Sequence, residues 1–437
     1  MNWRRPEEPG KYLANKVTKE EKKMANTYVV MAGGKGERLW PITQSVSKTM
    51  VRVLEKPLLE WIVEGVWNDA EKIVVVVGSN EKEVREHFEK TDYAKKIVYA
   101  RQEEPLGTGH AILQAEQFVE NNFITINGDN FFDPAIFKLI AQNAKKNNFF
   151  AVGKKVDDVR QYGVFKEKSG RVAGIEEKPA KTGPGLANLN LFFLPKFFFS
   201  YLKKQKKSQR GEYELPEAAE KFAKEHGLKL LEHSGFWTDV GFFWNYLDAS
   251  AYAVENLAKN ERKGRVEKGA VLAGKVSIGK GTVVKGGSRI EGPAWVGENC
   301  VIGPNAFIRV GTAIESNCFV GSSEVKNSVI MRGSKIPHFS YVGDSVVCED
   351  VNFGAGSKVA NLRFDSGVVK VELPKRGVFD SGRKKLGCAV GKGTRIGINA
   401  GINCGVLIGG KCRVLPCSFV SKNMENETTN WPEEKTE

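Results

Sequence analysis

The sequence predicts an α/β domain with a doubly wound, Rossmann-like sheet, followed by a left-handed parallel β-helix. In the first half of the chain, short apolar runs alternate with segments of helical spacing, as in a sheet covered by helices on both faces. In the second half, aliphatic residues recur at every sixth position over many copies. Neither an α-helix nor a β-meander has this period, which is typical of a β-helix built from hexapeptides.

Length and composition favour a folded protein of several domains that binds small anions. The chain has 437 residues, enough for two or three domains, and is 41% hydrophobic. Its formal net charge of +14 favours anionic partners. Because the lysines and arginines are spread along the chain, small anions are expected and nucleic acid is not. No apolar run approaches the length of a membrane span, so no membrane partner is expected.

The seven cysteines all lie in the last third of the chain, and none forms a CxxC pair. A cysteine metal site is therefore not expected, and the odd count favours free thiols. No secretory signal is evident, so we expect a cytoplasmic protein. Composition divides the chain into five expected segments: a flexible polar tail (1–25, with Met24 as an alternative start), the α/β domain (26–255), a linker (256–265), the β-helix (266–422) and an acidic tail (423–437).

The first apolar run, Tyr28–Met31, is expected to be a buried strand that leads directly into a glycine turn. Glycines let the backbone approach a bulky anion with its N–H groups, and the start of a following helix adds to the attraction. Arg38 and Lys48 place positive charges near the turn. The pattern predicts a cradle for a nucleoside triphosphate. Its backbone is expected to come from Ala32, Gly33, Gly34 and Gly36.

An ordinary strand-to-helix turn is the alternative, because GxG beside a strand is a weak signal. The turn is not the dinucleotide fingerprint GxGxxG, since Leu39 takes the place of its third glycine. It is not a P-loop either, because no Gly-Lys-Ser/Thr closes it. A second glycine-rich segment contains Gln102, Gly107 and Thr108, where glycines permit close approach to a flat base and a glutamine amide can pair with its edge.

Two aspartates are candidate Mg²⁺ ligands. Asp129 follows the apolar run Phe123–Ile126, and Asp239 stands in a similar apolar setting much later in the chain. An aspartate at the carboxyl end of a strand is well placed to bind Mg²⁺, and a turn-forming role is the alternative for either one alone. Two carboxylates and one divalent ion suit a reaction that releases pyrophosphate, because the metal neutralises charge on the phosphate oxygens.

These motifs together resemble the signature of the sugar-1-phosphate nucleotidyltransferases, with Ser47 in place of the family's usual proline. The resemblance implies catalytic roles for Arg38 and Lys48, and Mg²⁺ binding by the two aspartates. The segment around Gln102 resembles the base-recognition segment of uridylyl- and thymidylyltransferases. The residues implied to line the sugar-1-phosphate are Gly163, Glu177, Lys178 and Asn188. Asn190 stands where a glycine is usual, which leaves the identity of the sugar open.

The hexapeptide repeat predicts aliphatic residues inside the β-helix and small residues at its corners. The expected inward-facing residues are Val266, Leu272, Ile278, Val284, Ile290, Val296, Ile302, Ile308, Ile314 and Val320, and after a slip in phase Val390, Ile396, Ile402, Ile408, Val414 and Val420. The small positions include Cys300, Cys318 and Cys412, of which packing is expected rather than chemistry.

The repeat is interrupted between Glu324 and Asp344, where His338, one of only five histidines, stands near Tyr341. Irregularity in a regular solenoid often marks function. This stretch resembles the amino-sugar acetyltransferase half of the bifunctional enzymes that make UDP-N-acetylglucosamine, especially their archaeal form. The resemblance implies a homotrimer in which His338 takes a proton from the sugar amine as it attacks acetyl-CoA. The other residues implied at this site are Arg309, Lys326, Tyr341, Asn352 and Asn361.

The resemblance covers nearly all of residues 26–420. It implies nucleotidyl transfer from an NTP, with UTP favoured, to a sugar-1-phosphate, with N-acetylglucosamine-1-phosphate favoured. It also implies acetylation of glucosamine-1-phosphate or galactosamine-1-phosphate by acetyl-CoA. One alternative is a single-activity glucose-1-phosphate thymidylyltransferase or mannose-1-phosphate guanylyltransferase whose β-helix only oligomerises. Another is a non-catalytic regulatory subunit, which the complete set of charged residues argues against.

Overall fold

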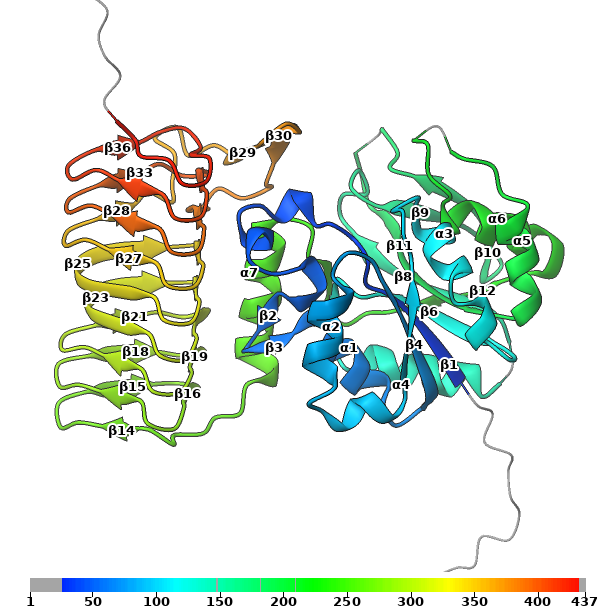
Figure 1. Ribbon diagram of the computed structural model, residues 1–437, viewed down its shortest axis with the longest axis horizontal. Coiled ribbons are helices and arrows are strands. Elements are labelled where there is room, and N and C mark those ends of the chain that lie inside the picture. The colour runs from blue at the N-terminus through cyan, green and yellow to red at the C-terminus, as the bar shows by residue number, and fades with distance from the viewer. Residues whose placement is uncertain (1–25, 147, 181, 209, 432–437) are drawn as a thin grey trace, which may run out of the picture.

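The computed structural model describes residues 26–431 except 147, 181 and 209. Two domains lie side by side, an α/β domain and a β-helix (Figure 1). The predicted tail 1–25 and the last residues of the chain, 432–437, lie outside the described residues. The predicted fold class, an α/β domain followed by a parallel β-helix, is confirmed.

The α/β domain contains a nine-stranded sheet in the order β5-β4-β1-β6-β11-β8-β12-β10-β9. Strand β1 is central, runs parallel to β4 and β6, and ends where the glycine turn begins. The antiparallel strand β11 joins this parallel half to the rest of the sheet. The strands are β1 (Asn26–Met31), β4 (Ala70–Val77), β5 (Ile97–Arg101), β6 (Phe123–Asn127), β8 (Phe150–Val156), β9 (Gly163–Lys168), β10 (Arg171–Glu177), β11 (Gly185–Leu194) and β12 (Lys229–Glu232).

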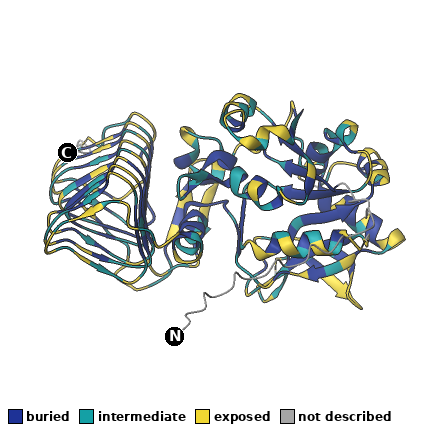
Figure 2. Ribbon diagram, turned by 90° about the horizontal axis from the view of Figure 1, so that it is seen from below, coloured by how far each residue is buried: buried dark blue, intermediate teal, exposed yellow. Residues whose placement is uncertain are grey.

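Helices cover both faces of this sheet, as the alternating sequence predicts. On one face α1, α2 and α4 share a core with Tyr28 and Val30 of β1, and on the other α3, α5 and α6 share a core with Val29. Figure 2 shows buried residues along the strands and exposed ones on the outer faces of the helices. The helices are α1 (Leu58–Val66), α2 (Glu81–Phe88), α3 (Thr108–Leu113), α4 (Ala135–Ala144), α5 (Phe199–Lys203), α6 (Leu215–His226) and α7 (Phe243–Tyr252).

Two small sheets and several short helices complete the domain. The pair β2 (Arg52–Val53) and β3 (Lys56–Pro57) forms one, and β7 (Asn130–Phe132) with β13 (Trp237–Asp239) forms the other. The second pair aligns Asp239 with Asn130 and so brings the two predicted metal ligands together. Short 3₁₀ helices cover Glu37–Leu39, Ile42–Gln44, Lys48–Met50, Asp92–Lys95, Glu116–Phe118 and Lys196–Phe198, and a π-helical turn covers Ala253–Leu257.

The β-helix stacks short parallel strands on three sides, with a regular step of eighteen residues as from Arg265 to Val283. The first side holds β14 (Arg265–Val266), β17 (Val283–Val284), β20 (Val301–Ile302), β23 (Phe319–Lys326), β25 (Lys335–Gly343), β27 (Asn352–Phe353), β32 (Arg395–Ile396) and β35 (Arg413–Val414). The second holds β15 (Val271–Ala273), β18 (Arg289–Glu291), β21 (Phe307–Ile308), the later parts of β23 and β25, β28 (Lys358–Val359), β33 (Gly401–Ile402) and β36 (Phe419–Val420). The third holds β16 (Val276–Ile278), β19 (Ala294–Val296), β22 (Thr312–Ile314), β24 (Val329–Ile330), β26 (Val346–Val347), β31 (Ala389–Val390) and β34 (Leu407–Ile408).

The predicted inward-facing residues from Ile278 onward are buried in one continuous core, and so are the cysteines at positions 300, 318 and 412. Val266 is 38% exposed and Leu272 is only partly buried, because they lie in the first coil and have no complete coil beneath them. The structure also extends the β-helix beyond the predicted 266–422. Arg262 pairs with Ile278 within the expected linker, and Met424 pairs with Ile408 within the expected acidic tail.

Between β28 and β31 the chain leaves the coil and forms a hairpin, β29 (Lys370–Leu373) with β30 (Gly377–Asp380). The hairpin projects from the β-helix towards the α/β domain (Figure 1).

Helix α7 lies between the two domains, and its apolar residues join a core with residues from the third side of the β-helix. Polar contacts add to this interface. The carboxylate of Glu55 accepts hydrogen bonds from the backbone N–H and the hydroxyl of Ser316, each at 2.9 Å, and pairs with Arg332 at 3.1 Å. The two domains therefore share a buried core. In the part of the chain that the structure describes, no helix is long and apolar enough to cross a membrane.

Glu315, next to this interface, is only 3% exposed, and its carboxylate accepts a hydrogen bond from the backbone N–H of Arg332 at 3.0 Å. Burial raises the pKa of Glu315 to about 7, against an ordinary value of 4.5. The folded protein thus keeps Glu315 protonated at pH values where the unfolded chain has already ionised it. The free energy of unfolding should therefore fall as the pH rises from about 4.5 through 7.

The variant Glu315→Gln tests this pH dependence, because glutamine keeps the carbonyl acceptor and has no proton to lose. We expect it to be more stable than the wild type above pH 7, by up to about 3 kcal/mol, since one pKa unit corresponds to about 1.4 kcal/mol. The advantage should shrink towards pH 5. Melting temperatures measured between pH 5 and 8 check this, and parallel profiles of the two proteins would contradict it.

Two candidate active sites

The glycine turn after β1 holds Arg38 and Lys48 at the carboxyl edge of the sheet. Gly36 has φ +67°, and a Cβ atom there would lie 2.7 Å from the Cβ of Lys48, so only glycine fits. The segment that follows is a 3₁₀ helix of three residues, Glu37–Leu39, and not the α-helix start that the sequence suggests. Attraction for an anion at this turn therefore comes from backbone N–H groups and side-chain cations, without the dipole of a long helix.

Lys48 is buried between the two predicted metal ligands. Its ammonium contacts the carboxylate of Asp129 and lies 3.2 Å from that of Asp239, and Arg38 lies 3.7 Å from the other oxygen of Asp239. Burial alone lowers the pKa of Lys48, but the charges of Asp129 and Asp239 outweigh this and raise it. Likewise, burial raises the pKa of Asp239, but Lys48 and Arg38 bring it below its usual value. Lys48 and Asp239 therefore keep their charges near neutral pH.

The two aspartates fit a Mg²⁺ ion that also binds substrate phosphates. The Oδ1 atom of Asp129 and that of Asn127 are buried, and neither has a hydrogen-bond partner in the structure. Within the described residues, no group of three or more His, Cys, Asp or Glu side chains is arranged to hold a metal. Mg²⁺ commonly binds through one or two carboxylates and completes its shell with phosphate oxygens and water. Two aspartates that contact the same ammonium, one of which has a carboxylate oxygen without a hydrogen-bond partner, suit this mode of binding.

A cavity of about 260 Å³ collects most of the predicted first site. The predicted residues that line it are Arg38, Lys48, Thr108, Asp129, Gly163, Glu177, Lys178, Asn188 and Asp239. Among the described residues, the other predicted nucleotide-binding residues stay outside its lining, namely Ala32, Gly33, Gly34, Gly36, Gln102 and Gly107. The cavity thus corresponds to the phosphate and sugar part of the expected site.

The predicted base-recognition segment is held by its own contacts. Gln102 is buried, and its amide nitrogen donates a hydrogen bond to the carbonyl of Gly107 at 3.1 Å. The same nitrogen lies 3.0 Å from Nδ1 of His110. Gly107 has φ +107°, and a Cβ there would lie 2.5 Å from the carbonyl oxygen of Tyr213. The loop is therefore fixed in shape by Gln102 and by close packing on Tyr213.

On the sugar side, Glu177 pairs with Arg210 at 3.1 Å, and Arg210 also donates to Glu214 at 3.0 Å. Arg210 is absent from the sequence-based prediction, because no motif surrounds it and only the fold brings it to the cavity. Asn190 has φ +52° and donates its backbone N–H to the side chain of Asn188 at 2.8 Å. This left-handed conformation explains why glycine is usual at this position and why asparagine, which tolerates it, replaces it here.

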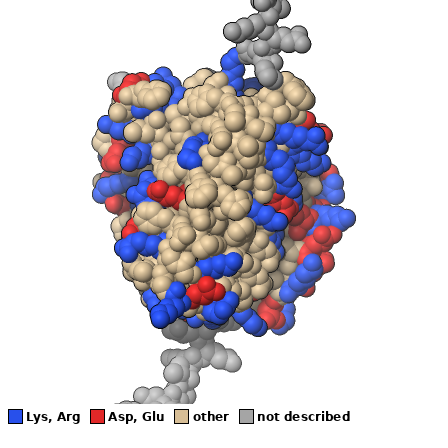
Figure 3. Space-filling view, turned by 90° about the vertical axis from the view of Figure 1, so that its left-hand side faces the viewer, with Lys and Arg blue, Asp and Glu red and all other residues tan. Residues whose placement is uncertain are grey.

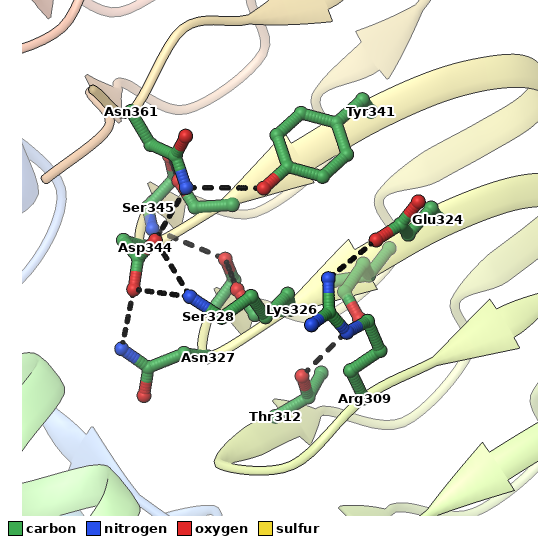
Figure 4. A network of polar contacts seen from close by, with 12 residues as sticks. Arg309, Thr312, Glu324, Lys326, Asn327, Ser328, Tyr341, Asp344, Ser345 and Asn361 are labelled. Carbon is green, nitrogen blue, oxygen red and sulfur yellow. Dashed lines mark hydrogen bonds and ion pairs between the residues drawn. The ribbon is translucent and has the colours of Figure 1, made fainter. Parts of the chain in front are cut away.

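In the β-helix, a connected polar network joins three of the predicted acetyl-transfer residues around Asp344 (Figure 4). The side chain of Asp344 is 4% exposed. Its carboxylate accepts hydrogen bonds from Asn361 at 2.6 Å and Asn327 at 2.7 Å, and lies 3.3 Å from the ammonium of Lys326. Asn361 also donates to the hydroxyl of Tyr341 at 3.0 Å. Asp344 is a residue that the sequence-based prediction missed, although it lies within the predicted interruption of the repeat.

The other three predicted residues of this site are not among the hydrogen-bond partners of Asp344. Arg309 pairs with Glu324 at 2.8 Å beside this network (Figure 4). His338 is exposed on β25, the strand that carries Tyr341, and aligns with Ser322 just before a shift in the register of β23 and β25. Asn352 begins β27 on the next coil. The irregular coil therefore gathers the second set of predicted residues on neighbouring strands.

Comparisons with known proteins agree with this two-part arrangement. The nucleotidyl transferase family model matches residues 27–256, and a model of the GlmU-like C-terminal hexapeptide matches residues 305–378. A bifunctional sugar-1-phosphate nucleotidylyltransferase/acetyltransferase of Sulfurisphaera tokodaii is 41% identical over 401 residues, which cover 90% of this chain and 97% of the relative. The bifunctional protein GlmU of Methanococcus vannielii is 36% identical over 92% of this chain and 96% of its own length, and that of Methanocaldococcus jannaschii is 35% identical over the same shares. The chain therefore belongs to the nucleotidyl transferase family, among its bifunctional members that join a nucleotidyltransferase domain to a hexapeptide acetyltransferase domain.

Proposed function

We propose that the first cavity transfers a nucleotidyl group from UTP to N-acetylglucosamine-1-phosphate and releases pyrophosphate. The observation that carries this proposal is the convergence of Arg38, Lys48, Asp129 and Asp239 on one cavity, in a chain whose relatives are named as sugar-1-phosphate nucleotidylyltransferases. Two cations and two carboxylates at one place suit a reaction in which negative charge moves onto a departing pyrophosphate.

In this proposal a phosphate oxygen of the sugar-1-phosphate attacks the α-phosphorus of UTP, and the bond from that phosphorus to pyrophosphate breaks. Arg38 and Lys48 stabilise the charge that develops on the pyrophosphate. Lys178, which lines the same cavity, contacts the sugar phosphate, while Glu177 and Asn188 contact sugar hydroxyls. Mg²⁺ bound by Asp129 and Asp239 would neutralise phosphate charge during the reaction.

We propose that the β-helix acetylates glucosamine-1-phosphate, with galactosamine-1-phosphate as a further acceptor. The amine nitrogen attacks the thioester carbon of acetyl-CoA, the C–S bond breaks, and coenzyme A leaves as a thiolate that then takes up a proton. His338, exposed on its strand, accepts the proton of the amine. Arg309 and Lys326 hold the sugar phosphate. Contacts to the amine and the acetyl group come from Tyr341, Asn352 and Asn361.

We further propose a cytoplasmic homotrimer assembled through the β-helix. The face of the β-helix that points away from the α/β domain carries few charges along its centre, with most Lys, Arg, Asp and Glu at its margins (Figure 3). Large apolar side chains are exposed on the β-helix, including Phe339 beside His338 at 73% and Phe419 at 62%. Such exposure favours contact with other copies of the chain. The free thiols of the seven cysteines fit a reducing compartment.

Two assays on the purified wild-type protein test the proposed function. The first measures pyrophosphate release from UTP with N-acetylglucosamine-1-phosphate, and the second measures thiol release from acetyl-CoA with glucosamine-1-phosphate. We expect both activities, each dependent on its sugar phosphate. Pyrophosphate release without sugar-dependent thiol release would favour a single-activity enzyme whose β-helix only oligomerises. Absence of both activities would favour a regulatory subunit.

The variant Asp129→Asn tests the first site. It removes one carboxylate from the proposed metal site and from the environment of Lys48 while keeping the side-chain volume. We expect pyrophosphate release to fall by at least about 100-fold, as for the loss of a group that stabilises transition-state charge. Thiol release should stay within about two-fold of the wild type and serves as the control for folding. Equal loss of both activities in folded protein would argue against two independent sites.

The variant His338→Ala tests the second site in the opposite direction. Because the imidazole is the proposed general base and lies at the surface, its removal should lower thiol release by about 100-fold or more without unfolding the β-helix. Pyrophosphate release should be unchanged. Replacement of the neighbouring exposed residue, Phe339→Ala, is the control for a general effect on this surface. Normal thiol release by His338→Ala would remove His338 from the mechanism.

A further inference from the structure

The β29–β30 hairpin belongs in sequence to the acetyltransferase half, but it lies against the first active site. Its first strand is fixed in the core between the domains, where Val371 is fully buried and Leu373 is 2% exposed. Beyond its second strand, Arg383 pairs with Asp248 of α7 and donates a hydrogen bond to the carbonyl of Trp244 at 3.1 Å. The hairpin is therefore anchored to the α/β domain on both sides of its tip.

The tip of the hairpin reaches the glycine turn. Arg376 pairs with Glu37, the residue directly before Arg38. A hollow between the turn and the hairpin is lined by Lys35 and Trp40 from one side and by Lys375 and Phe379 from the other. Two lysines thus face the same space beside the turn that is proposed to hold the triphosphate.

Phe379 also connects the hairpin with the catalytic arginine. Its ring lies 5.2 Å from the ring of Phe242, and the guanidinium of Arg38 lies 4.9 Å from the centroid of the same Phe242 ring. Phe242 also stacks on Trp244, with 4.3 Å between the two ring centroids and an angle of 9° between the ring planes. The Phe242 ring is thus held between Trp244 and the hairpin, and Arg38 rests on it.

Besides the Phe242 ring, the contacts of the Arg38 guanidinium in the described part of the chain include Asp239 and the backbone at Gly241. Its ion pair with Asp239 is long, at 3.7 Å, and its side chain is 35% exposed. A second cavity, of about 520 Å³, lies beside the first and shares Arg38, Tyr162 and Lys178 with it. The opposite wall of this second cavity is formed by residues 379–383 of the hairpin segment. The position of the guanidinium therefore depends on the Phe242 ring, and the hairpin segment lines the space around the guanidinium.

We propose that the hairpin of the β-helix is a working part of the nucleotidyl-transfer site, and that Phe379 is a positioning residue that holds Arg38 in place through Phe242. This inference rests on the proposed nucleotidyl transfer. It gives the β-helix a role in the first reaction that is separate from acetyl transfer and from oligomerisation. A displaced guanidinium stabilises a departing pyrophosphate less well, because electrostatic stabilisation requires a preorganised position.

The test compares Phe379→Ala with Val378→Ala, its neighbour on the same strand, which is 63% exposed. Both variants shorten one apolar side chain of the hairpin, but only the first removes the contact with Phe242. We expect Phe379→Ala to lower kcat for pyrophosphate release by about ten-fold, with the KM for the sugar phosphate changed by less than about two-fold. Phe379→Tyr, which keeps the ring, should recover most of the activity. Thiol release should be normal in all three variants.

A double-mutant cycle with Arg38→Ala separates positioning from a structural role. If Phe379 acts through Arg38, Phe379→Ala should lower pyrophosphate release no further once Arg38 has been removed. Equal activity of the Phe379→Ala and Val378→Ala enzymes would overturn the inference, as would an additive effect in the cycle. UTP binding measured without sugar phosphate gives a second readout. Weaker binding by Phe379→Ala, with normal binding by the other variants of the hairpin, supports the inference even if the wild type releases no pyrophosphate. A wild type without pyrophosphate release would refute the proposed function alone.

Discussion

The first candidate active site depends on one buried ammonium, that of Lys48, enclosed by the carboxylates of Asp129 and Asp239. Buried charges are tolerated only when they are paired, and here each charge compensates the others. The three residues come from distant parts of the chain, and the fold must hold each one in place. The glycine turn after β1 supplies the lysine, the end of β6 leads to Asp129, and the pairing of β7 with β13 supplies Asp239.

The same physical arrangement recurs in the β-helix with a carboxylate at its centre. Asp344 is almost fully buried, and it binds the ammonium of Lys326 and the amides of Asn327 and Asn361. Asp344 has φ +52° and lies at a corner of the coil, where its backbone N–H donates to the carbonyl of Lys326 at 2.9 Å. Asn317 and Asp350 take the same left-handed conformation at other corners, and their backbone N–H groups donate to the carbonyls of Glu298 and Arg332. The buried carboxylate is therefore accommodated at a corner of the coil, and this level differs from the others in the polar side chains that surround the corner.

The interface between the domains joins the two sites into one molecule. The third side of the β-helix is flat and apolar, and helix α7 buries its apolar residues against it. This contact fixes the position of the hairpin, at the point where it leaves the β-helix, relative to the glycine turn of the other domain. Because the hairpin segment then lines a cavity beside Arg38, a segment of one domain shapes the candidate active site of the other.

The sequence by itself determined the features that depend on local pattern. The six-residue period predicted the β-helix core and the burial of its cysteines, and an apolar run before glycines predicted β1 and its turn, because strand and turn formation depend on neighbouring residues. Motif spacing also identified Lys48, Asp129 and Asp239, which the structure brings together. Only the tertiary structure decided the contacts of Arg210, Glu315, Asp344 and Phe379. Each of these residues acts through partners on other strands or in the other domain, and such contacts arise from packing in space, which leaves no periodic or local signal in the chain.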